Sequence, residues 1–162
     1  MLAVTLALGG CSPGTDPKPT PTPLFASEAD AYKAAEKVYR EYVDATNARN
    51  DGDESADPRK YLAGSALEHA VESARKRQEG GYSITGHSTV ESFRGMETLL
   101  EPPTATAKAE VCVDGSQTRV VDRAGTDVTP VDREPKGLVR VTFSQSKNSL
   151  LITSSELVST QC

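Results

Sequence analysis

The chain has 162 residues and a formal net charge of −5 at pH 7. Without its apolar start and a proline-rich stretch it keeps about 135 residues, enough for one domain with one hydrophobic core. A mildly acidic domain does not attract phosphate backbones, so we expect no nucleic-acid partner. The only basic run, Arg75-Lys76-Arg77, lies where a helix is predicted to end, and cations there complement the helix dipole.

The start of the chain has the pattern of an export signal. An apolar run over residues 2–10 closes with small residues directly before Cys11. The run is too short to span a bilayer, which takes about 20 apolar residues, and we interpret residues 1–10 as a signal peptide. Because no basic residue precedes the run, we expect the true translation start to lie upstream.

The segment Leu8-Gly9-Gly10-Cys11 resembles the lipobox of bacterial lipoproteins. The resemblance implies a diacylglyceryl thioether on Cys11 and cleavage directly before it. Two acyl chains suffice for stable anchoring, so we expect the membrane as partner of Cys11 and the domain on the outer face of the cell membrane. The alternative is a cytoplasmic protein with an apolar N-terminus and a chance cysteine.

Residues 11–26 are predicted to be a tether between the lipid and the domain. Five of the ten prolines of the chain fall here, alternating with threonine. Such a sequence favours extended polyproline II and has nothing to bury. Fully extended, it reaches about 45 Å at ~3.1 Å per residue. The folded domain is therefore expected over residues 27–162.

The first half of the domain is predicted to be helical. Ser27 is a candidate N-cap for a helix over residues 29–48, whose apolar positions recur at helical spacing. Asp57-Pro58 opens a short helical turn. Ser65 begins a capping box for a second helix that ends at Gly80-Gly81. That helix is expected to place Leu67, Ala70, Val71 and Ala74 on one face.

The second half is predicted to form strands. Residues 104–114 alternate between apolar and polar side chains, as do residues 138–145, and residues 150–158 form the last strand. Residues 82–93 are a less regular strand, residues 123–126 are a hairpin turn, and residues 146–149 turn the chain before the last strand. The expected fold class is α+β, with N-terminal helices packed on one face of a curved antiparallel sheet of four to five strands.

Three cysteines are present, and an odd number in an exported protein requires an explanation. If Cys11 carries lipid, Cys112 and Cys162 are left to form a disulfide in an oxidising compartment. Cys112 lies on the polar face of its predicted strand, where a partner outside the core can reach it. The alternative is two free thiols.

This order of elements, with the lipobox, the tether and the terminal cysteine, resembles actinobacterial lipoproteins that carry a nuclear transport factor 2-like (cystatin-like) domain. Three segments carry the resemblance: the opening helix 29–48, Ala109–Asp114, and Leu151–Ser154 running on to Cys162. It covers residues 27–162 and departs from the family at Asn148-Ser149-Leu150, where relatives tend to have Asp-Gly and then Trp. It implies a cone between helix and sheet; most such lipoproteins have no assigned activity.

Enzymes on this fold place acids, histidines or tyrosines inside the cone. The candidates here are Tyr39, Tyr42, Asp44, Tyr82 and His87. A ketosteroid-isomerase-like site needs a carboxylate base and a tyrosine donor that converge on a carbonyl. Packing in the core or at its rim is the simpler role for the two helix tyrosines.

The leading functional hypothesis is a non-catalytic interaction or ligand-binding module at the cell envelope, with an envelope protein or a small apolar ligand as partner. A small ketosteroid-isomerase-like enzyme is the first alternative, and a lipoprotein that modifies the envelope or excludes superinfecting phage is the second. Neither His69 nor His87 has a partner at metal-ligand spacing, so we expect no metal and no cofactor. A cone with Asp44 beside a tyrosine favours the enzyme, and a cone filled by apolar side chains favours the module.

Overall fold

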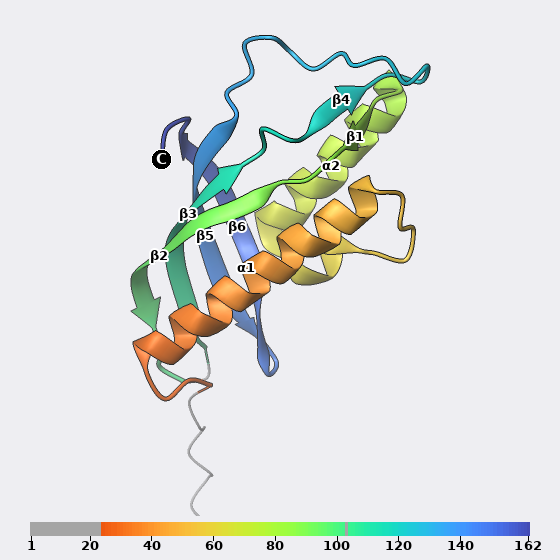
Figure 1. Ribbon diagram of the computed structural model, residues 1–162. Helices are drawn as coiled ribbons and strands as arrows, with labels where there is room; N and C mark the ends of the chain where they lie inside the picture. Colours follow the sequence, from red (N-terminus) through yellow and green to blue (C-terminus); the bar gives the residue numbers. More distant parts are fainter. Residues whose placement is uncertain (1–23, 103) are drawn as a thin grey trace, which may run out of the picture.

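The computed structural model describes residues 24–102 and 104–162, so the predicted signal peptide, Cys11 and most of the tether lie outside the described residues. The described chain has helices first and strands after, which is the predicted α+β order (Figure 1). The elements are α1 (Glu28–Asn50), the 3-10 helix η1 (Pro58–Tyr61), α2 (Gly64–Gly80), β1 (Ser83–Thr85), β2 (Thr89–Leu99), β3 (Thr106–Asp114), β4 (Arg119–Val121), β5 (Lys136–Ser146) and β6 (Ser149–Ser159).

The main sheet is antiparallel and four-stranded, in the order β2-β3-β5-β6. Register shifts interrupt the pairing of β2 with β3 and of β5 with β6, and such bulges bend and twist the strands. Helix α1 runs diagonally across one face of this curved sheet, and α2 lies against β6 (Figure 1). Strands β1 and β4 form a small second sheet that the sequence analysis did not separate from the first.

Helix α1 begins where its sequence predicts. The Ser27 Oγ accepts a hydrogen bond from the backbone N–H of Asp30 (3.2 Å), which satisfies one of the unpaired donors of the first turn. The buried residues recur every four positions and so share the face of α1 that meets the sheet: Ala31, Ala35, Tyr39 and Val43.

The alternation predicted for β3 is also confirmed. Ala107, Ala109 and Val111 are almost fully buried in one cluster with residues of α1. The largest fully buried side chains, Phe143, Ile152, Val111 and Val141, come from the three strands β3, β5 and β6. The hydrophobic core therefore lies between α1 and the middle of the main sheet.

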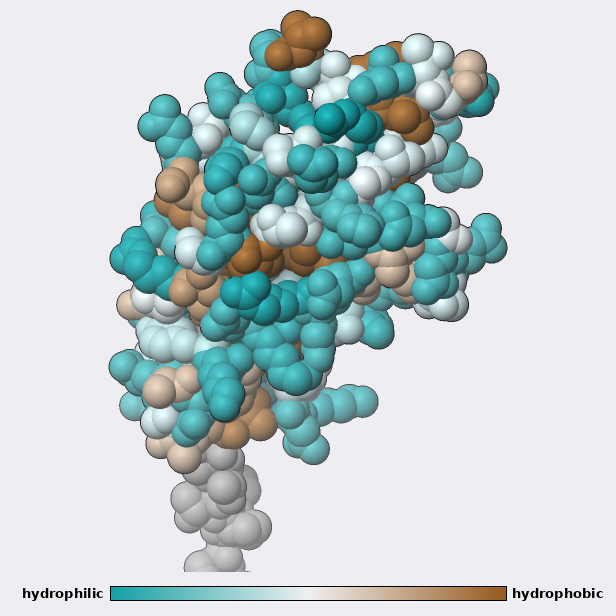
Figure 2. All heavy atoms as spheres, viewed as in Figure 1, coloured by the Kyte–Doolittle hydropathy of each residue, from teal (hydrophilic) through white to brown (hydrophobic). Residues whose placement is uncertain are grey.

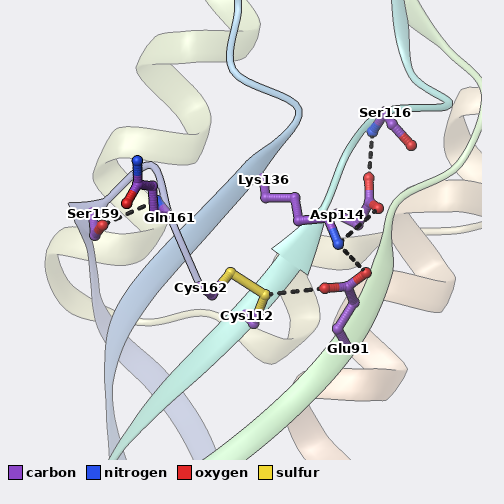
Figure 3. The surroundings of a disulfide bond; sticks show 8 residues. All are labelled: Glu91, Cys112, Asp114, Ser116, Lys136, Ser159, Gln161 and Cys162. Carbon is purple, nitrogen blue, oxygen red and sulfur yellow. Dashed lines mark hydrogen bonds and ion pairs between the residues drawn. A yellow bond between two sulfur atoms is a disulfide. The ribbon is translucent and has the colours of Figure 1, made fainter.

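The predicted disulfide is present and joins Cys112 to Cys162, with Cα atoms 5.8 Å apart. After β6 the chain end crosses β5 to reach β3, and Cys112 is only 3% exposed beneath it (Figure 3). Glu91 and Lys136 flank the bond, with the Lys136 Nζ 2.5 Å from the Glu91 Oε1. The disulfide thus fixes the last strand to the centre of the sheet.

The capping box predicted at Ser65 is wrong. Helix α2 begins at Gly64 after Ala63, which has no capping side chain, and the Ser65 hydroxyl donates instead to the Thr153 carbonyl (3.1 Å). The reason is tertiary: Leu62 forms a bridge with Ile152 of β6 and the Ala63 N–H donates to the Ile152 carbonyl (2.8 Å), so the segment between η1 and α2 is held against β6 directly before the helix begins. Gly64 makes this sharp change of direction with φ +53°, a conformation that glycine adopts without strain.

The single strand predicted over residues 82–93 is two strands. Strand β1 ends at Thr85 and β2 begins at Thr89. Between them Gly86 has φ +77°, and a Cβ atom there would lie 2.1 Å from the Gln117 carbonyl oxygen. Strand β2 then continues to Leu99, because pairing with β3 along its length compensates for its irregular alternation.

Three predicted chain reversals are confirmed. Gly81 ends α2 in the left-handed conformation (φ +74°). The turn at 123–126 is closed by a bridge between Val121 and Asp127, although β4 forms its ladder with β1. The β5–β6 hairpin turns at residues 147 and 148, with Lys147 at φ +56°.

Candidate ligand-binding cleft

The space between α1 and the sheet is filled by side chains. The Tyr39 ring packs edge-on against Phe143 with ring centroids 6.5 Å apart, and the Phe93 ring lies 6.1 Å from Phe143. Burial of the Tyr39 phenol raises its pKa well above the ordinary value for tyrosine. A packed core thus occupies the place where the family resemblance implied a cone.

The sequence-predicted pocket residues do not converge on one cavity. Unlike the buried Tyr39, Asp44 has an exposed side chain on α1. The His87 ring is exposed and places its Nε2 2.7 Å from the Asp51 Oδ2, beyond the end of α1. Tyr42 and Tyr82 line two neighbouring hollows described below. This arrangement gives the carboxylate and the tyrosines no common reaction centre.

A cleft of about 850 Å³ lies between the C-terminal half of α1, η1 and α2, and we call it the interhelix cleft. Alanines recur every four residues along the side of α2 that lines it, and their short side chains leave the space open. Val71, which the sequence placed on the buried face, is 49% exposed, so the helix is rotated relative to that prediction. The apolar lining consists of Tyr42, Ala56, Pro58, Leu62, Ala66, Ala70, Ala74 and Ile84.

A second hollow of about 650 Å³, which we call the arginine end, adjoins the cleft and shares lining residues with it, Arg49, Ala74 and Arg77 among them. Both helices run toward this end of the molecule (Figure 1), and Arg49 and Arg77 stand in their last turns. Arg123 joins them from the turn after β4. Among the described residues that line the arginine end there is no carboxylate, whereas the rest of the cleft contains Glu54 and Asp57.

Sequence reasoning missed this cleft. It assigned the basic run at the end of α2 to the helix dipole alone and had no means of bringing Arg49 and Arg123 next to Arg77. The available signal was that each helix carries an arginine in its last turn. Only the direction of α2 relative to α1 makes these arginines neighbours.

On the face shown in Figure 2 hydrophilic residues predominate, and hydrophobic residues form small separate groups. Within residues 24–102 and 104–162 no set of three or more metal-ligating side chains is assembled. Over the same residues no helix combines the length and apolar character that crossing a membrane requires.

Comparisons with known proteins establish the fold and not the activity. No family model and no curated protein matches the chain. Among solved structures it is similar to the intermembrane space region of the chloroplast protein ARC6, with a TM-score of 0.54 and 15% sequence identity, over 78% of this chain and 95% of that chain. At this identity the similarity concerns the arrangement of helices and sheet.

Proposed function

We propose that the protein is a membrane-anchored extracytoplasmic lipoprotein whose domain is a non-catalytic ligand-binding module, with the interhelix cleft as its binding site. One observation carries the proposal: the interior between α1 and the sheet is packed, while a cleft of about 850 Å³ opens between the two helices. Ligand pockets commonly measure about 300–1,000 Å³ and combine apolar walls with a few polar groups. The cleft fits that description.

The anchor is supported by the lipobox-like segment before Cys11 and the proline-rich stretch after it. The disulfide adds support, because such bonds persist in oxidising compartments and are rare in the cytosol. The predicted tether is followed by α1, and residues in the last turn of this helix line the arginine end. At 1.5 Å per residue α1 is about 34 Å long, so the arginine end is remote from the start of the folded domain.

We further propose that the domain is a nuclear transport factor 2-like fold whose cone is closed by aromatic and aliphatic side chains. A curved four-stranded sheet under a long opening helix supports this relationship. The isomerase-like alternative receives no such support, because it requires a carboxylate facing a tyrosine. Asp44 instead has its side chain exposed while Tyr39 is buried in the core.

The anchor is tested by metabolic labelling with a fatty-acid analogue in a bacterial host. The wild-type chain, given an upstream basic start if export requires one, should incorporate the label, and Cys11→Ser should lose it. Ser12→Ala serves as the matched control and should label like the wild type. Equal labelling of the Cys11→Ser chain would contradict the anchor.

The cleft is tested by small molecules that co-purify with the full chain from host envelopes. Ala74→Trp should fill the cleft from α2, whereas Val71→Trp places the same ring on the exposed side of that helix. Mass spectrometry should find a species with the wild type and with Val71→Trp that Ala74→Trp lacks. The same species in all three preparations, or none with the wild type, would contradict binding in the cleft. Thermal melting of the three chains checks that all are folded.

A further inference from the structure

The arginines that line the arginine end differ from most others in the described chain. Six arginines form ion pairs with carboxylates: Arg40, Arg59, Arg75, Arg94, Arg119 and Arg140. Within residues 24–102 and 104–162 no carboxylate pairs with Arg49, Arg77 or Arg123, which all line one hollow. The remaining arginine, Arg133, directs its guanidinium to Thr118 and Gly115 beside the same hollow.

Each of the three arginines keeps hydrogen-bond donors available. Arg49 donates from one nitrogen to the Glu54 carbonyl (2.8 Å), and a guanidinium has five N–H donors. The half-buried Arg77 lies near the Tyr42 phenol: burial raises the pKa of Tyr42, and the charge of Arg77 opposes that rise. The Arg123 side chain lies over Gly81, where a Cβ atom would meet its Nε at 2.4 Å.

Favourable interaction with the helix dipoles explains the position of only two of these three arginines. Cations in the last turn of a helix stabilise it, which accounts for Arg49 and Arg77. Arg123 belongs to no helix and reaches the site from the turn after β4, across the glycine that ends α2. Three arginines from three elements line one hollow that has no carboxylate among its described lining residues, and guanidinium groups are the side chains that pair best with anions such as phosphate.

We propose that the interhelix cleft binds a small soluble organic phosphate, with the phosphate group at the arginine end and the carbon skeleton on the apolar lining between the helices. This inference rests on the proposed function of the cleft. Guanidinium groups pair with phosphate oxygens in a bidentate manner, and Ser83 and Ser88 add hydroxyls to the lining. The excess negative charge of the whole chain repels a large polyanion, whereas a small phosphate ester can bind inside the hollow beside the arginines.

Net charge favours a soluble source of the phosphate over a lipid headgroup. The chain carries a formal net charge of −5, so an anionic membrane surface repels the domain as a whole. A soluble phosphate ester reaches the cleft from any direction.

The test uses the full chain carrying Cys11→Ser, so that it is unlipidated, with three probes: phenyl phosphate, phenol and inorganic phosphate. Isothermal titration should show 1:1 binding of phenyl phosphate that weakens as salt is raised. Arg77→Gln and Arg123→Gln should each raise its Kd about tenfold or more, since hydrogen bonds to charged groups are the strong ones. Arg75→Gln is the matched control, because Arg75 pairs with Glu72 and Glu79 on α2, and should change the Kd less than twofold.

Several outcomes would overturn the phosphate site, and each can be told apart from a failure of the proposed ligand-binding function. Phenol binding as tightly as phenyl phosphate would refute the phosphate site while leaving a binding cleft. An equal loss of affinity in Arg75→Gln would show a nonspecific charge effect. Binding to phosphatidylglycerol vesicles that depends on Arg77, without binding of phenyl phosphate, would assign the anion to lipid and refute the soluble class. If no phosphate probe binds, the inference fails, and the co-purification experiment with Ala74→Trp still decides the function of the cleft.

Discussion

Replacing Cys162 with serine removes the cross-link between β3 and the chain end without touching the core. The two cysteines are separated by 50 residues in the sequence. In the chain-entropy treatment, closing a loop of that size stabilises the fold by about 4 kcal/mol at 25 °C. For a domain of about 135 residues, 1 kcal/mol corresponds to roughly 3–4 °C in Tm. Cys162→Ser should therefore lower Tm by roughly 12–16 °C.

Differential scanning calorimetry of the unlipidated chain measures this shift. Gln161→Ala is the matched control, because Gln161 is an exposed neighbour outside the cross-link. Reduction of the wild type should reproduce the effect, whereas reduction of the variant should add nothing. A fall in Tm below about 3 °C would refute the loop-entropy reasoning. Two reactive thiols in the unreduced Cys11→Ser chain, whose only cysteines are Cys112 and Cys162, would refute the bond itself.

Three further variants test the fold. Phe143→Ala should cost about 3–5 kcal/mol in urea unfolding, because it empties the centre of the core; a cost below about 1 kcal/mol would contradict that packing. Gly86→Ala should destabilise the fold by at least about 1 kcal/mol more than Gly125→Ala. Both glycines have positive φ, but only at Gly86 would the added Cβ meet a backbone oxygen. Equal losses of stability would contradict the close approach of Gly86 to that oxygen. Arg140 and Arg94 hold the Glu110 pKa below its ordinary value. The stability advantage of wild type over Glu110→Gln should therefore be complete above about pH 5 and should vanish as the pH falls through the lowered pKa. An advantage that does not change with pH would contradict this reasoning.

The sequence predicted best the features that short-range physics determines. Ser27 and Gly81 end helices through local hydrogen bonds and backbone conformation, and both were assigned correctly. The alternation along β3 fixed which side chains face α1, because one buried face sets the register of a strand. Cys112 and Cys162 were paired by counting thiols, which needs no knowledge of the fold.

Contacts between distant segments account for the errors. Ser65 has the local pattern of a capping box, yet the hydrogen bond from Ala63 to Ile152 starts the helix earlier. Strand β2 alternates poorly and owes its length to pairing with β3. In both cases the decisive partner lies tens of residues away along the chain, where no local pattern reports it.

The same limit explains why the expected pocket and the cleft lie in different places. Alanines at 107 and 109 place only methyl groups on the inner face of β3, which leaves room for large side chains to pack there. Tyr39 and Phe143 fill that room, so the interior of the fold is occupied by its own aromatic rings. Along α2 the alanines have the opposite effect, because the α1 side chains opposite them, Tyr42 and Thr46 among them, line the gap without filling it. Alanines therefore lie beside a filled interior on β3 and beside an open cleft on α2, and the difference is set by the side chains that face them.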